Sequence, residues 1–135
     1  MPARRDSLLD SFAMLAFLNK ENGFEKVRSL LNAARDSNRH LLMNEINIGE
    51  VYYVTAKGRS LEQAEDFLRR LETLPIQPVS NTFSDVLEAA RLRARFPISC
   101  ADAFALATAI RRSAAIVTGD REFARVEHLV KIDWL

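Results

Sequence analysis

Short apolar runs alternate along this chain with longer stretches in which apolar residues recur every three to four positions. The short runs predict buried strands, and the longer periodic stretches predict amphipathic helices. Strands are predicted, in chain order, over residues 7–10, 40–43, 76–79, 115–118 and 129–132. Helices are predicted over residues 12–20, 24–36, 45–57, 60–73, 84–96 and 99–112, with a helical turn over 121–126.

Strands that alternate with helices favour a parallel sheet covered by helices on both faces. We therefore expect an α/β, three-layer fold with a central, mainly parallel sheet of four to five strands. The sequence shows no internal repeat and no linker rich in proline, glycine or serine. Residues 1–135 are accordingly expected to form one domain.

The composition narrows the class of protein without identifying it. With 48% hydrophobic and 27% charged residues, the chain resembles a soluble globular protein. No apolar run is long enough to span a membrane, and the N-terminal MPARRDSLLDS lacks the apolar core of a signal peptide. The single cysteine excludes an intrachain disulfide and fits a reducing, cytoplasmic location. Among the 19 basic residues, 15 are arginines, a weak indication of a polyanionic or acidic partner.

The helix predicted over 99–112 raises a chemical question, because it is apolar on nearly every side. Between Pro97 and Ile110 its one carboxylate is Asp102. A helix of this kind is expected to be buried, and a buried carboxylate without a partner is costly. Asp102 is therefore a candidate functional residue.

Four further acids are also candidate functional residues. Asp10 and Asp120 directly follow two predicted strands, and the carboxyl ends of parallel strands are where ligands bind in open α/β sheets. Glu50 lies mid-helix and is expected to share an inward-facing stripe with Ile46, Tyr53 and Val54. Glu122 follows Asp120 by two residues and points either to the same place or to water.

Structural roles remain open for each acid taken singly. Asp10 and Asp120 are also good helix N-caps, and Asp102 follows Ser99 at the spacing of a capping box. For Glu50 the alternative is a buried salt bridge with Arg93 or Arg111.

Several carboxylates that converge at one edge of a sheet repel one another unless a cation offsets them. Oxygen ligands without histidine or cysteine suit Mg²⁺ or Mn²⁺ better than zinc. The sequence therefore predicts a site for a divalent metal.

Four segments resemble those of PIN-domain ribonucleases, and in particular the VapC-type toxins of bacterial toxin–antitoxin pairs. They are, in the order of that family, LLDSFAMLAFL, EINIGEVYY, SCADAFALATA and IVTGDREF. The resemblance implies that Asp10, Glu50, Asp102 and Asp120 form the acidic quartet, with Glu122 as a further acid. Ser11 and Thr118 match hydroxyls that commonly support the acids. Asp6 could compete with Asp10, but it precedes the apolar end of the strand.

The resemblance implies a Mg²⁺- or Mn²⁺-dependent endoribonuclease that hydrolyses phosphodiester bonds in cellular RNA, such as transfer or ribosomal RNA. It also implies a homodimer and a cognate VapB-type antitoxin. One alternative is a PIN-like module that binds RNA or protein without cleaving it. A phosphatase of the haloacid-dehalogenase type is disfavoured, because the DxDxT motif that it needs is replaced by Asp10-Ser11-Phe12-Ala13.

Overall fold

The computed structural model describes residues 5–135. The first four residues, part of the N-terminal segment considered above, lie outside the described part. The strands are β1 (Ser7–Leu9), β2 (Leu41–Asn44), β3 (Ile76–Val79), β4 (Ala115–Thr118) and β5 (Ile132–Trp134). The helices are α1 (Ser11–Asn19), α2 (Phe24–Asp36), α3 (Glu45–Gly58), α4 (Leu61–Thr73), α5 (Phe83–Arg95), α6 (Cys100–Arg112) and the 3₁₀ helix η1 (Arg121–Val126).

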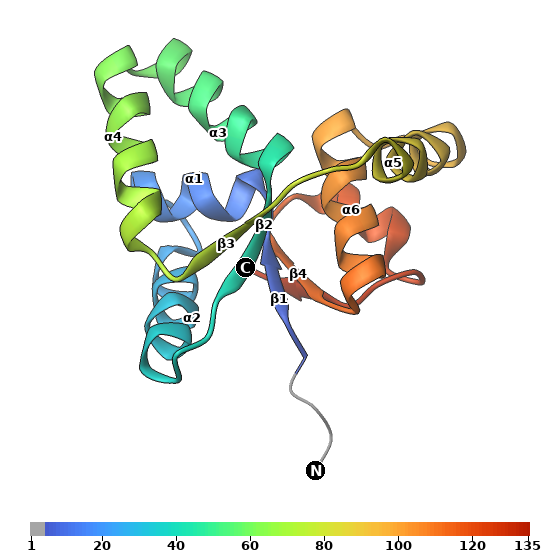
Figure 1. The fold of residues 1–135 in the computed structure, drawn as a ribbon, viewed down its shortest axis with the longest axis horizontal. Coiled ribbons are helices and arrows are strands. Elements are labelled where there is room, and N and C mark those ends of the chain that lie inside the picture. Colours follow the sequence, from blue (N-terminus) through green and yellow to red (C-terminus); the bar gives the residue numbers. More distant parts are fainter. Residues whose placement is uncertain (1–4) are drawn as a thin grey trace.

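The strands form one sheet in the order β3-β2-β1-β4-β5, and each neighbouring pair is parallel. Helices α1 to α4 lie on one side of the sheet, and α5 and α6 lie on the other (Figure 1). The expected α/β three-layer fold with a parallel central sheet is therefore confirmed. Because the strands are parallel, β1, β2 and β4 all end at the same edge, close to the starts of α1, α3 and η1.

Alternate residues of β1, β2 and β4 supply two separate cores, one on each face of the sheet. Leu8 packs with the side chains under α5 and α6, whereas its neighbour Leu9 packs under α1 to α4. Ile116 and Val117 of β4 divide in the same way. This period of two explains why the strands appear in the sequence as continuous apolar runs.

The prediction for the last strand was wrong by about three residues. The sequence predicts a strand over 129–132, but β5 begins at Ile132, where it pairs with Ile116 of β4. Leu129 instead closes a turn, since its N–H donates to the Val126 carbonyl at 2.9 Å. The edge strand is only half-buried, so its residues lack the continuous apolar run that marks β1 and β4.

Within residues 5–135, no helix has both the length and the apolar character needed to cross a bilayer.

Candidate metal centre

Three carboxylates from two parts of the chain meet at the carboxyl edge of the sheet. They belong to Asp102 of α6 and to Asp120 and Glu122, which follow β4. One oxygen from each side chain lies within 4.8 Å of the other two. Asp102 is buried, and Glu122 is exposed. We call these three residues the acidic trio; it is open to solvent on the side of Glu122.

At the start of α6 the Asp102 carboxylate lies beside the Ser99 hydroxyl, but among residues 5–135 it does not complete a capping box. Ser99 caps the helix, and its Oγ accepts a hydrogen bond from the Asp102 N–H at 3.1 Å. A full capping box would return a bond from the Asp102 side chain to the Ser99 N–H, as Asp85 does for Thr82 at the start of α5. In the described part of the chain that return bond is not made for Ser99. The capping alternative therefore accounts for Ser99 and does not account for the Asp102 side chain.

Asp10 caps α1 and is tied to β4 as well. Its Oδ1 accepts from the Ala13 N–H at 2.9 Å, and its Oδ2 accepts from the Thr118 hydroxyl. The same Thr118 oxygen accepts from the Asp120 N–H at 2.9 Å. One buried hydroxyl thus links the carboxylate of Asp10 to the backbone of Asp120, so capping and a place in the site coexist for Asp10.

Asp120 and Glu122 are set by the turn that follows β4. The Asp120 Oδ1 accepts from the Glu122 N–H at 3.0 Å, which starts η1 and fixes Asp120 as its cap. Gly119 precedes Asp120, and a Cβ at this position would collide with the ring of Phe12. The missing side chain therefore lets the first turn of α1 approach the backbone beside the acids.

Burial and mutual repulsion both raise the pKa values of Asp10 and Asp102. Burial, with smaller contributions from the charges of Asp102 and Asp120, raises the pKa of Asp10 from 3.8 to about 7. Burial raises the pKa of Asp102 to about 7 as well, and the charges of Asp120, Glu50 and Glu122 add to the effect. Within residues 5–135 no lysine or arginine forms an ion pair with any of these five acids.

Glu50 lies near enough for its charge to raise the pKa of Asp102, but its oxygens are not part of the acidic trio. The expected inward-facing stripe is wrong, because Ile46, Tyr53 and Val54 are 39%, 51% and 37% exposed. The buried face of α3 instead carries Asn47, Val51 and Thr55. Two of these three are polar, so the apolar periodicity of the sequence identified the wrong face of the helix.

The alternative of a buried salt bridge for Glu50 is not supported. Arg111 pairs with Asp85 and Glu88, each at 3.3 Å, and the Arg93 Nε donates to the Ile98 carbonyl.

Ser11 is buried beside Asp10 but contacts α3. Its hydroxyl donates to the Asn47 carbonyl oxygen at 3.4 Å and accepts from the Asn47 side-chain Nδ2 at 3.1 Å. This contact was not predicted: α3 is capped by Asn44, and Asn47 lies on the buried face of the helix. The one available signal was that Asn47 stands four and eight residues before Val51 and Thr55, which share the buried face.

The donor set of the acidic trio fits a hard divalent cation. It offers only carboxylate oxygens, at mutual distances that a single ion can bridge, and no lysine or arginine among residues 5–135 forms an ion pair with them. Mg²⁺ and Mn²⁺ fit these oxygens, whereas a zinc site would be expected to include histidine or cysteine.

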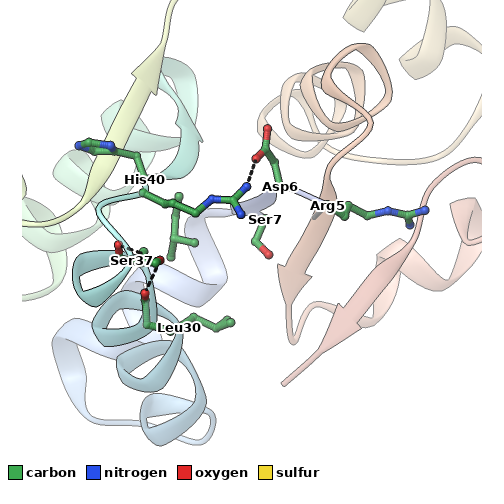
Figure 2. A pocket seen from close by; sticks show the side chains of 10 residues that line it. Arg5, Asp6, Ser7, Leu30, Ser37 and His40 are labelled. Atoms are coloured by element: carbon green, nitrogen blue, oxygen red, sulfur yellow. Dashed lines mark hydrogen bonds and ion pairs between the residues drawn. The ribbon is translucent and has the colours of Figure 1, made fainter. Parts of the chain in front are cut away.

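A small hollow lies at the opposite edge of the sheet and is unrelated to the acids. It encloses about 50 Å³ between the amino end of β1 and α2 (Figure 2). Its polar feature is an ion pair at 3.5 Å between Asp6 and Arg39. Asp6, the competitor of Asp10 in the sequence, is therefore placed away from the acidic trio.

Comparisons with known proteins agree with the fold. Residues 7–129 match the family model described as PIN domain. The comparison with curated proteins gave no match.

Among solved structures, the chain is similar to one in DNA-bound VapBC from Salmonella typhimurium, with 18% identity and a TM-score of 0.77 over 97% of this chain and 98% of that one. It is also similar to VapBC2 from Rickettsia felis bound to a promoter DNA fragment, with 18% identity and a TM-score of 0.75 over 95% and 97%. A third similar structure is the Mycobacterium tuberculosis toxin VapC20, described as cleaving the sarcin-ricin loop, with 12% identity and a TM-score of 0.77 over 94% and 98%.

Proposed function

This chain belongs to the PIN-domain family, and from that premise we propose that it is a metal-dependent endoribonuclease, the toxin of a toxin–antitoxin pair. The observation that carries the proposal is the acidic trio, in which carboxylates gather without an ion pair to any lysine or arginine in the described part of the chain. Purely structural acids would be expected to pair with arginine or lysine, as Asp85 pairs with Arg111 in this chain.

The residues have distinct roles in this proposal. Asp102, Asp120 and Glu122 hold a Mg²⁺ or Mn²⁺ ion, and Asp10 and Glu50 add negative charge beside it. When bound, the ion supplies a Lewis acid for a phosphodiester oxygen and lowers the pKa of a water molecule.

Thr118 keeps the Asp10 carboxylate in one orientation, because its hydroxyl is itself fixed by the Asp120 N–H. The exposed side chain of Glu122 lies where a phosphate group could enter from solvent.

We propose cellular RNA, such as transfer or ribosomal RNA, as the substrate class. Support comes from the toxin of similar fold that cleaves the sarcin-ricin loop, and from the excess of arginine over lysine in this chain.

Two sets of exposed apolar side chains support the two protein partners that we propose. Phe12, Tyr53 and Leu61 belong to α1, α3 and α4 and are 43%, 51% and 63% exposed. Phe83 and Ile110 belong to α5 and α6, on the other side of the sheet (Figure 1). We propose that the first set contacts a VapB-type antitoxin and the second a further copy of this chain. Two of the structures of similar fold reported above are VapBC assemblies.

The proposal is tested by incubating the purified chain with end-labelled RNA and either Mn²⁺, Mg²⁺ or a chelator. Cleavage is expected with either metal. It is expected to stop when the chelator is added and to return when the metal is restored. Glu50→Gln is expected to weaken cleavage. Glu45→Gln, an exposed acid in the first turn of the same helix, serves as the matched control and is expected to retain it.

The alternative to a nuclease is a PIN-like module that binds RNA or protein without cleaving it. RNA binding without cleavage under every metal condition would favour that alternative. Cleavage that continues unchanged in the chelator would remove metal from the proposal.

A further inference from the structure

Asn47 is a fully buried polar side chain at the meeting point of three helices. It lies on the buried face of α3 and is 0% exposed. Its Nδ2 donates to the Ser11 hydroxyl at 3.1 Å and to the Ala101 carbonyl at 3.3 Å. Ser11 begins α1, and Ala101 lies in the first turn of α6. One carboxamide group therefore connects the starts of both helices to α3.

The two residues that Asn47 contacts are the chain neighbours of two acids. Ser11 follows Asp10, and Ala101 precedes Asp102. Asn47 itself lies three residues before Glu50, about one helical turn away. Its hydrogen bonds thus act on the backbone that carries Asp10 and Asp102, and on the helix that carries Glu50.

The carboxamide oxygen of Asn47 has no hydrogen-bond partner. Across residues 5–135, it is the single buried side-chain nitrogen or oxygen in this condition. A buried acceptor without a donor costs stability.

A leucine at this position would remove that cost without leaving a new unpaired group. The Ser11 hydroxyl would still reach the carbonyl oxygen of residue 47, and the Ala101 carbonyl is an acceptor within the α6 helix. The two hydrogen bonds that leucine would lose are offset by the removal of this cost, so stability alone gives little reason for asparagine at this position.

We propose that Asn47 is a positioning residue, which holds the starts of α1 and α6 at the separation that Asp10 and Asp102 need to act on one divalent cation. This inference rests on the metal site of the proposed function. Groups that orient metal ligands commonly change metal affinity by about 10- to 100-fold when they are removed. A residue that only supported the fold would change stability and leave metal affinity as it was.

The test compares Asn47→Leu with the wild type by titration calorimetry of Mn²⁺ and by thermal unfolding of the metal-free protein. We expect the dissociation constant for Mn²⁺ to rise by about tenfold or more. The melting temperature of the metal-free variant is expected to equal or exceed that of the wild type, because the unpaired oxygen is gone. Affinity and stability would then move in opposite directions, which a purely structural role does not produce.

Thr55→Val is the matched control, since Thr55 lies on the same buried face of α3 two turns beyond Asn47. It is expected to leave the affinity for Mn²⁺ unchanged. If Asn47→Leu does not fold, Asn47→Ser takes its place, because serine is too short to make both contacts. For Asn47→Ser the expected result is again the tenfold loss of affinity.

The outcomes separate this inference from the proposed function. A wild type that does not bind Mn²⁺ overturns the metal site and the inference together. A wild type that binds Mn²⁺, beside an Asn47 variant of equal affinity, overturns the inference alone. The inference is also wrong if Thr55→Val loses affinity to the same extent, since the effect would then be a general loosening of α3.

Discussion

Asp6 and Asp10 stand four residues apart at the two ends of β1, and the fold treats them in opposite ways. Asp6 is partly exposed at the amino end and pairs with Arg39 at 3.5 Å. Asp10, at the carboxyl end, is 1% exposed, is held by the Thr118 hydroxyl and the Ala13 N–H, and has a pKa raised to about 7. The same side chain is partly exposed and paired with an arginine at one end, and it is buried with a raised pKa at the other.

The difference between Asp6 and Asp10 follows from the groups that lie at each edge of a parallel sheet. The carboxyl edge receives the starts of α1, α3 and η1, and helix starts carry unpaired N–H groups and a partial positive charge. Such groups stabilise a carboxylate at each start separately, as the N–H of Ala13 does for Asp10. They do not cancel the repulsion among several acids, which is why the acidic trio fits a cation.

The largest expected effect comes from replacing Asp10 by asparagine, with the same replacement of Asp6 as its control. Asp10→Asn is expected to reduce RNA cleavage by roughly a thousandfold, because it removes a charge from the proposed metal site. Asp6→Asn, the matched control at the amino end, is expected to cleave at the wild-type rate. Both rates are measured with the same labelled RNA in Mn²⁺. Equal activity of Asp10→Asn and the wild type would remove Asp10 from the chemistry.

The next effect is on stability as a function of pH in the metal-free protein. Because the pKa of Asp10 is about 7 in the folded chain and 3.8 as its ordinary value, the folded state binds the proton more tightly than the unfolded state. The free energy of unfolding should therefore fall as pH rises, by roughly 2–3 kcal/mol from this group between pH 5 and 8. Asp102 acts in the same direction.

Urea unfolding in the presence of a chelator measures this dependence. In Asp10→Asn the decline should be smaller, and the remainder is due to Asp102. A wild-type stability that stays level or increases between pH 5 and 8 would contradict the raised pKa values.

The smallest expected effect is at the amino end. Arg39→Ala breaks the ion pair with Asp6, in which both side chains are more than two-fifths exposed. Exposed pairs contribute between 0 and about 1 kcal/mol, so the loss of unfolding free energy should stay below about 1 kcal/mol and shrink further in high salt. Chemical denaturation at low and high salt measures it. If Arg39→Ala lost as much unfolding free energy as the wild type loses between pH 5 and 8, the amino and carboxyl ends of β1 would not differ in the expected way.

Much of the fold could be predicted from the sequence, because the cores are apolar on both faces of the sheet. The runs at 76–79 and 115–118 coincide with β3 and β4, and the segment 24–36 coincides with α2. Strand β5 was predicted about three residues too early, since this half-buried edge strand lacks such a run. Its position depends on pairing with β4, which no local pattern reveals.

The candidate site was predicted less evenly. The acids that follow strands, Asp10 and Asp120, could be identified because a parallel sheet brings strand ends together. The environment of Glu50 could not, because Asn47 and Thr55 make the buried face of α3 partly polar. Thr118 was expected beside the acids from the family resemblance alone, because its contact with Asp10 joins segments more than a hundred positions apart and leaves no periodic signal in the sequence.

The strand order also has a consequence for the time at which the protein becomes complete during its synthesis. Strand β1 is made first, yet it pairs with β4, and Asp10 depends on Thr118 for its orientation. Two of the three members of the acidic trio, Asp120 and Glu122, follow β4, more than a hundred residues after Asp10. Since domains are synthesised from the N-terminus, a growing chain that has not yet reached β4 holds Asp10 and Asp102 as isolated acids. The acidic trio can therefore assemble only after most of the sheet has been made.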